Sequence, residues 1–316
     1  GQAGRPHHNY PQTRRRAEIM LQVAIFVVVL AVSTGLWVWI TTQWQRGNPI
    51  IPLARRRPVP WQAQDVFFII LIGLLLPVMA TVAVQAWMGS DAAQRASDQK
   101  PELDHEAEQL LRSGNPSAVA IAVIMAVLVA PLFEEFLFRV LLQGWLEAVW
   151  SRQRRKYPKL RAVPVSWIPI VLPATIFALM HLRSGKTPLS TQYLTGLFLG
   201  QMAADLVMLG LAIVLLRFAV GATAADLGWK PEKLRSDAKL GILALLAATP
   251  PILMLQVSLT GLVTWAGIDY APDPIPLFFL ALVLGVLYRR THRIAPSVVL
   301  HIAFNTTAVL LLFAGK

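Results

Sequence analysis

The sequence contains no cysteine, and that absence removes several kinds of chemistry at once. Without cysteine there is no disulfide framework, no thiolate metal site and no cysteine nucleophile. Two catalytic signatures are missing as well: no GxSxG motif marks a serine nucleophile, and no HExxH motif marks a zinc-binding helix. These absences favour attack by activated water over an acyl-enzyme if the protein is a hydrolase.

Acidic residues are scarce, with 17 Asp and Glu against 29 Lys and Arg, for a formal net charge of +12. In a soluble protein such an excess would indicate a nucleic-acid partner. Here the basic residues cluster at the ends of apolar runs, as RRR at 14–16, RRR at 55–57 and RQRRKYPKLR at 152–161. That pattern is typical of membrane insertion next to anionic lipid. We therefore expect a lipid bilayer as partner and no nucleic acid.

Hydrophobic residues make up 55% of the chain, and several apolar runs approach or exceed the roughly 20 residues that cross a bilayer. Nothing alternates like a barrel strand, so the spans are expected to be helices, which satisfy their own backbone. The sequence predicts an all-α, polytopic integral membrane protein, multi-pass and resident in a cell membrane, with a buried hydrophilic cavity. About eight transmembrane helices are expected, at 19–41, 65–88, 118–149, 166–182, 190–218, 238–266, 276–290 and 295–314.

The segments between these runs differ in charge. The polar stretch 89–116 holds most of the local acidity and is expected to form a short helix in an aqueous loop. Four other loops are basic, which predicts that they share the cytoplasmic side. The basic loops are 44–57, 150–161, 217–239 and 289–293.

Three charged residues interrupt the apolar run APLFEEFLFRVLLQGW at 130–145. Each charge at the centre of a membrane helix costs about 2.5–3.5 kcal/mol, so partners are expected. Glu135 and Arg139 stand at i and i+4, and this spacing predicts an ion pair. Glu134 lies about 100° further round the helix, without a partner on its own helix, as a general base requires. A packing network of ions without chemistry is the alternative.

Two further motifs place polar residues inside apolar runs: FALMH at 177–181 and HIAFN at 301–305. His181 alone is explained by a satisfied hydrogen bond, and Asn305 alone by contact between helices. Together with the glutamates they indicate one cavity on three helices. There, Glu134 and a histidine can bind or deprotonate water, while His301 and Asn305 can donate to an oxyanion. Alternatively, a glutamate and two histidines can hold a zinc ion with an open position.

The motifs EEFLFR, FALMH and HIAFN resemble the EExxxR, FxxxH and HxxxN motifs of the CPBP family, and they occur in the family's order. This family is the CAAX-protease and bacteriocin-processing group of intramembrane proteases, formerly called Abi. The resemblance covers about 118–182 and 276–314. It implies a protease domain at 61–316, preceded at 1–60 by a basic segment and an additional transmembrane helix.

The resemblance also implies roles for the site residues. Glu134 and His181 would activate water, His301 and Asn305 would stabilise the oxyanion, and Glu135 would hold Arg139. Family members have been described as metalloproteases and as glutamate-dependent proteases, so a zinc ion held by Glu134, His181 and His301 stays open. The expected substrate is a membrane-associated or prenylated peptide or protein, cut near or within the membrane.

Two other functions use the same residues. A non-catalytic membrane protein could bind peptide, lipid or an ion in the polar cavity. A proton-coupled transporter could relay protons through glutamate and histidine, although no inverted repeat is visible in the sequence. The sequence also departs from the family pattern at 183–275, which is longer than the usual link and carries an AADLGW turn at 224–229.

Overall fold

The structure is a computed structural model that describes residues 10–51, 53–54, 58–88, 106–162, 167–182, 190–268 and 273–314. None of these residues lies in a strand. The α-helices are α1 (Tyr10–Gln45), α2 (Ala63–Met88), α4 (Glu106–Arg112), α5 (Pro116–Ile124), α6 (Ala130–Glu135), α7 (Gly144–Lys156), α8 (Trp167–Met180), α9 (Thr191–Val214), α10 (Leu234–Trp265), α11 (Pro274–Thr291) and α12 (Ala295–Ala314). The π-helical segments are η1 (Met125–Val129), η2 (Phe136–Gln143) and η4 (Leu215–Ala219), and the 3-10 turns are η3 (Pro158–Ala162) and η5 (Pro231–Lys233).

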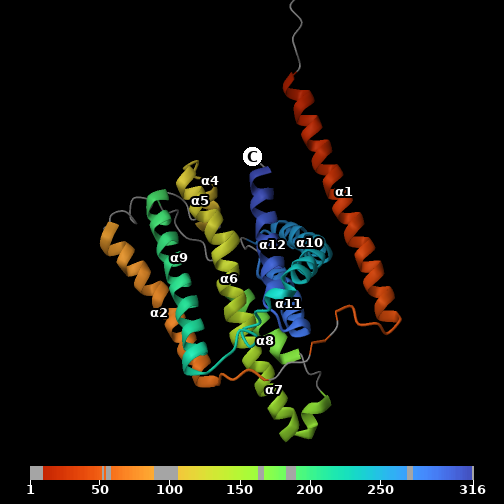
Figure 1. Cartoon of the computed structure of the whole chain (residues 1–316). Helices are drawn as coiled ribbons and strands as arrows, with labels where there is room; N and C mark the ends of the chain where they lie inside the picture. Colours follow the sequence, from red (N-terminus) through yellow and green to blue (C-terminus); the bar gives the residue numbers. More distant parts are fainter. Residues whose placement is uncertain are drawn as a thin grey trace, which may run out of the picture.

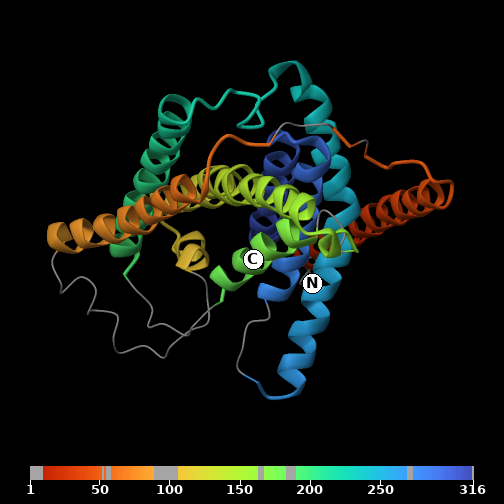
Figure 2. The ribbon, with the colours of Figure 1, turned by 90° about the horizontal axis from the view of Figure 1, so that it is seen from below.

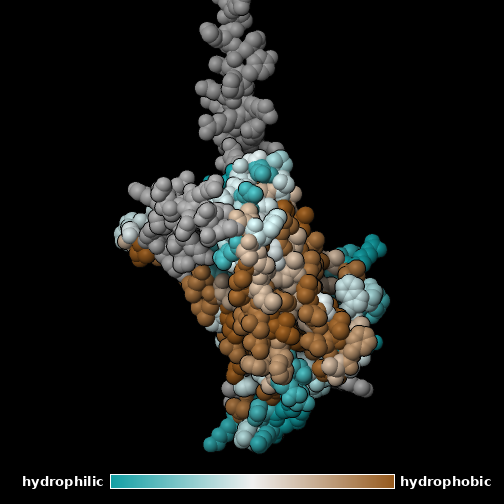
Figure 3. Space-filling view, turned by 90° about the vertical axis from the view of Figure 1, so that its left-hand side faces the viewer, coloured by the Kyte–Doolittle hydropathy of each residue, from teal (hydrophilic) through white to brown (hydrophobic). Residues whose placement is uncertain are grey.

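Seven helical runs in the described part of the chain are long and apolar enough to cross a membrane. Apolar side chains form a broad belt between hydrophilic ends in the space-filling view (Figure 3). The prediction of an all-α, multi-pass integral membrane protein is thereby confirmed. The remaining expected span, 166–182, is the 14-residue helix α8. At 1.5 Å per residue α8 is about 21 Å long, short of the roughly 30 Å hydrocarbon core.

The longest helical run extends from Pro116 to Lys156 without a break and comprises α5, η1, α6, η2 and α7. Its last turn carries Arg154, Arg155 and Lys156, which ends the run in a polar surrounding. The predicted polar stretch 89–116 precedes this run, and its first part, 89–105, lies outside the described residues. Its second part forms the short helix α4, as expected, and α4 buries Leu110 and Leu111 in a cluster with α5 and α9.

The helices pair into a bundle with one outlying member. The helix α2 packs along α9, α8 along α11, and α10 along α12. Figures 1 and 2 show α2 and α9 on one flank of the long central helix and α1 on the opposite side, against α10. The first and last described helical ends, of α1 and α12, both lie at the upper end of Figure 1.

The basic loops meet at the other end of the molecule. The loop after α1 reaches α11 where the Ala54 N–H donates to the Arg290 carbonyl at 2.8 Å. The turn after α9 reaches the start of α12 where the Ile294 N–H donates to the Gly228 carbonyl at 3.1 Å. A 3.5 Å ion pair joins α7 to the last turn of α11. The described parts of the four basic loops therefore lie at one end of the bundle, and the cytoplasmic side of that end stays a prediction.

A pair of prolines in α10 fixes the position of α1. Pro251 follows Pro250 and has no N–H, so the carbonyl of Ala247, four residues earlier, lacks its helical donor. That carbonyl accepts instead from Trp37 Nε1 at 2.9 Å and from Ser33 Oγ at 3.4 Å, both on α1. Because an unpaired carbonyl is costly in lipid, the interrupted helix provides a specific attachment point for α1.

Replacing Trp37 by Phe removes the main donor to this carbonyl and should destabilise the protein by about 1 kcal/mol. The measurement is thermal unfolding of the purified protein in detergent. Trp39→Phe is the matched control, since Trp39 is equally exposed on α1 and makes no hydrogen bond with the described residues. Equal melting temperatures for the two variants would contradict the proposed attachment.

Candidate active site

The two glutamates lie on α6, a short α-helical piece between the π-helical segments η1 and η2. A π-helical insertion shifts the residues that follow it around the helix axis, and such insertions are frequent at functional sites. In this helix η1 precedes the motif EEFLFR and η2 begins within it. Arg139 therefore lies within η2, although its spacing from Glu135 remains i and i+4.

The predicted ion pair between Glu135 and Arg139 is confirmed. Arg139 Nε donates to Glu135 Oε2 at 3.3 Å, and both side chains are fully buried, with 0% exposure. Arg139 points into the bundle and not toward lipid. Helix α11 comes very close to Arg139 and its surroundings at Gly285. A Cβ added to Gly285 would meet Ile170 Cγ2 at 2.9 Å and Gln143 Oε1 at 3.3 Å.

His301 on α12 connects the two glutamates. Its Nδ1 lies 3.1 Å from Glu135 Oε1, and its Nε2 lies 3.6 Å from Glu134 Oε2. A carboxylate only accepts, so Nδ1 carries the hydrogen when it bonds Glu135, and the imidazole is thereby held with Nε2 toward Glu134. The sequence paired Glu135 only with Arg139, but the structure gives Glu135 a second partner.

Glu134 differs from its neighbour in being accessible. Its side chain is 23% exposed, whereas those of Glu135 and His301 are 0% and 3% exposed. Among the predicted acids, only Glu134 can therefore meet an entering molecule. It also lies close enough to His181 for the two side chains to interact electrostatically.

His181 follows the end of α8 and is oriented by Phe177. His181 Nδ1 lies 2.8 Å from the Phe177 carbonyl, and the two rings pack with centroids 4.6 Å apart. The carbonyl can only accept, so Nδ1 is the protonated nitrogen and Nε2 is left for other partners. The same Phe177 ring lies 5.8 Å from the His301 ring, which places both imidazoles around one aromatic side chain.

Asn305 makes a specific contact that the backbone of η1 explains. In η1 the Ala130 N–H donates to the Met125 carbonyl five residues earlier. The corresponding donor for Ala126 would be residue 131, which is proline and has no N–H. Asn305 Nδ2 donates to this free Ala126 carbonyl at 2.8 Å. One amide hydrogen of Asn305 is thus engaged by the Ala126 carbonyl. The predicted role of Asn305 as an oxyanion donor therefore depends on its second amide hydrogen.

The described residues contain no preformed centre for the predicted zinc ion. Within the described ranges, no three His, Asp or Glu side chains gather closely enough to hold a metal ion, and this includes Glu134, His181 and His301. The zinc ion stays a prediction. The assigned roles of Glu134, Glu135, Arg139, His181, His301 and Asn305 also stay predictions, although their placement is clear.

Sequence reasoning missed a column of polar side chains below the ion pair. Gln143, four residues after Arg139, donates from Nε2 to the Gly285 carbonyl at 2.9 Å and to Glu147 Oε1 at 3.1 Å. Glu147 then pairs with Arg289 near the basic end. The signal was a polar residue at every fourth position after Glu135. This column joins the site to the basic side of the membrane.

Asp205 on α9 is a second missed residue. Its side chain is buried, accepts from Gln201 Nε2 at 2.7 Å and interacts electrostatically with Glu134. The signal was an acid inside the apolar run QMAADLVM, because an ionisable residue at that depth costs about 2.5–3.5 kcal/mol and usually has a function.

Fold and site together define a polytopic membrane protein with an accessible carboxylate, a buried ion pair and two oriented imidazoles within the bundle. The family model of the type II CAAX prenyl endopeptidase Rce1-like proteins matches residues 116–230 and 231–307. The chain belongs to that family, which confirms the resemblance read from the three motifs. The match includes the segment 183–275, and α1 and α2 lie outside it. No curated protein and no solved structure matches the chain.

Replacing Arg139 by Ala leaves the fully buried Glu135 carboxylate without its cation and should cost about 3–5 kcal/mol of stability. Thermal unfolding in detergent measures the loss. The double variant Glu135→Gln, Arg139→Met removes both charges at similar volume and should recover most of it. If the double variant were as unstable as Arg139→Ala, an uncompensated charge would not be the cause.

Proposed function

We propose that the protein is an intramembrane endopeptidase in which Glu134 and His181 activate water to cut a peptide bond near or within the membrane. The observation that carries this proposal is the difference between the adjacent glutamates. Glu134 is accessible and lies beside two imidazoles, whereas Glu135 is sealed and engaged by Arg139 and His301. Membership in a family of CAAX prenyl endopeptidases supports the same class of reaction.

The reaction begins with a water molecule between Glu134 and His181. Glu134 takes a proton from the water, and the resulting hydroxide attacks the carbonyl carbon of the scissile bond. The carbonyl π electrons move to oxygen and form the tetrahedral oxyanion. When this intermediate collapses, the bond to nitrogen breaks and the proton on Glu134 passes to the leaving amine. The carboxylate of Glu134 is thereby regenerated.

The oxyanion is stabilised by His301 and Asn305, on one face of α12. With Nδ1 of His301 donating to Glu135, a hydrogen on Nε2 faces Glu134 at 3.6 Å and can turn to the oxyanion once Glu134 has taken the proton from water. The buried pair of Glu135 and Arg139 acts on the reaction through His301, which it holds in place. Asn305 contributes through the amide hydrogen that does not bond Ala126.

The substrate class follows from the family. A CAAX prenyl endopeptidase acts on a chain that ends in C-a-a-X and carries a prenyl group on the cysteine of that motif. Such a substrate partitions into the bilayer, as its prenyl group requires. We therefore propose a prenylated peptide or protein, reaching Glu134 from the membrane, as the substrate.

Glu134→Gln keeps the shape of the side chain but removes the base. It should lower turnover of a farnesylated C-a-a-X peptide by at least about 10²–10⁴-fold, the usual contribution of general-base catalysis. The assay uses purified protein in lipid vesicles. Glu232→Gln, at an exposed position in η5, is the control. Wild-type turnover in the Glu134 variant would exclude water activation by this residue, and no turnover by the wild type would favour a non-catalytic binder.

Asn305→Ala should lower kcat on the same peptide by about 10²–10³-fold with little change in KM, because an oxyanion donor acts mainly in the transition state. The comparison variant is Thr306→Ala, whose hydroxyl bonds only the Ile302 carbonyl on its own helix. Melting temperatures of both variants separate catalysis from the lost bond to Ala126. A loss of stability with unchanged kcat would assign Asn305 to helix packing alone.

A further inference from the structure

A large apolar groove lies on the far side of the bundle from α2 and α9, between α1, α10 and α11. Its volume is about 750 Å³, within the about 300–1,000 Å³ of small-molecule sites. The walls consist almost entirely of aliphatic and aromatic side chains, among them Leu36, Ile40, Ala244, Ile252, Phe279 and Val283. One wall comes from α1, the helix that lies outside the family match.

The groove is separated from the candidate active site by the thickness of α11. Val283 and Val286 on α11 line the groove, whereas Gly285 faces the other way, toward Arg139 and Gln143. A prenyl chain lying in the groove would therefore place its peptide on the wrong side of α11 from Glu134. This arrangement points to an occupant other than the substrate.

The groove opens at the basic end onto a second, more polar cavity of about 480 Å³. The two cavities share Ile50, Ile51 and Val286, and the second one is also lined by Arg290 and Asn48. Arg290 is exposed, and its side chain makes no hydrogen bond or ion pair with any described residue. A cation without a partner among the described residues thus stands at the mouth of an apolar groove.

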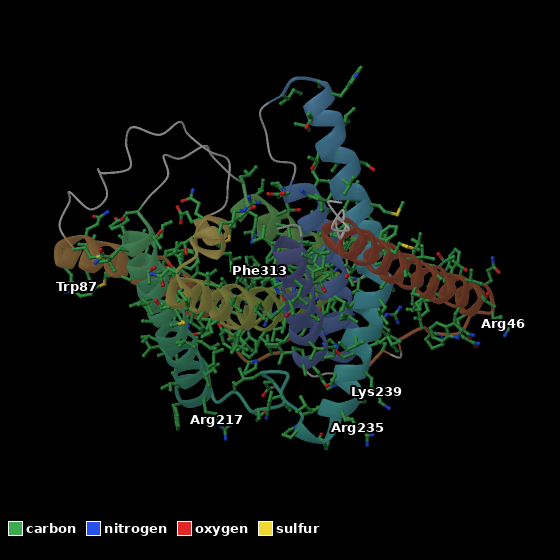
Figure 4. All side chains as sticks on the ribbon, turned by 90° about the horizontal axis from the view of Figure 1, so that it is seen from above. Arg46, Trp87, Arg217, Arg235, Lys239 and Phe313 are labelled. Carbon is green, nitrogen blue, oxygen red and sulfur yellow. The ribbon has the colours of Figure 1, made fainter. Side chains whose placement is uncertain are left out.

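Other features of the mouth match the membrane interface. Trp44, which lines the second cavity, is an aromatic residue of the kind enriched at headgroup level. Lys239 on α10 stands next to the groove residue Leu240 and is exposed. Figure 4 labels Lys239 on α10 and Arg46 just after the outer end of α1, the two helices that form walls of the groove. Positive charge therefore surrounds this end, where the anionic leaflet is expected.

We infer that the groove is a binding site for one anionic phospholipid. An acyl chain lies between α1, α10 and α11, and the phosphate lies at the mouth beside Arg290 and Asn48. The apolar walls suit a hydrocarbon chain, and Arg290, whose side chain has no partner among the described residues, suits an anion, so a molecule that carries both fits the whole site. An anionic phospholipid in the leaflet at the basic end of the protein has both an acyl chain and an anionic headgroup. The lipid fills the space between α1 and α11 that the protein leaves open.

The test is native mass spectrometry of the full chain, purified in neutral detergent and titrated with phosphatidylglycerol or phosphatidylcholine. One phosphatidylglycerol should bind more tightly than phosphatidylcholine. Arg290→Ala should weaken phosphatidylglycerol binding about fivefold and leave phosphatidylcholine unchanged, as expected for one basic residue at an anionic headgroup. Arg152→Ala is the control, on α7 at the same basic end but outside both cavities.

A second variant tests the chain-binding part. Ala244→Phe fills the groove and should weaken both lipids, whereas Ala203→Phe, on the exposed face of α9, should weaken neither. Melting temperatures without added lipid establish that these variants are folded. Equal binding of both lipids by all variants would mean ordinary boundary lipid and would overturn the inference. Displacement of phosphatidylglycerol by a farnesylated peptide would overturn it too, since the groove would then belong to the substrate. None of the substituted residues belongs to the candidate active site, so this test is independent of the proposed function.

Discussion

The fully buried ion pair between Glu135 and Arg139 is the constraint on which the centre of the molecule depends. A buried charge is tolerated only when it is paired and hydrogen-bonded, so the helices around the pair have to supply those contacts. Glu135 obtains a second contact from His301, and α11 comes close enough at Gly285 to enclose Arg139. The ion pair thus joins α6 and η2, and the contact with His301 adds α12 and orients the imidazole that faces Glu134. Helix α11 covers the guanidinium, whose two terminal nitrogens make no hydrogen bond with the described residues.

Proline organises the same bundle by leaving carbonyl groups without a donor. Pro131 leaves the Ala126 carbonyl to Asn305 of α12, and Pro251 leaves the Ala247 carbonyl to α1. Both contacts join helices that are distant in sequence. In water a free carbonyl finds a solvent partner, but in a bilayer it has to find a side chain. Each of these two prolines therefore specifies a helix–helix contact.

The sequence was sufficient for the helical spans and the Glu135–Arg139 pair, because these follow from local spacing and from hydropathy. It could not supply the contact of His301 with both glutamates or of Asn305 with Ala126, because these depend on how separate helices meet. The π-helical segments η1 and η2 also have no simple sequence signature, although they set the faces of the long helix. Asp205 and Gln143 did have a signal, a polar residue in an apolar run, and each became meaningful only once its neighbours in space were known.

The unequal access to the two glutamates has a consequence for inhibitor design. A small molecule that enters the site meets Glu134 and the half-buried His181, while Glu135, Arg139 and His301 are sealed beneath them. The polar groups available to such a compound are therefore few. Most of its binding energy has to come from apolar contacts around the site, and its polar part needs little more than one cation placed to meet Glu134.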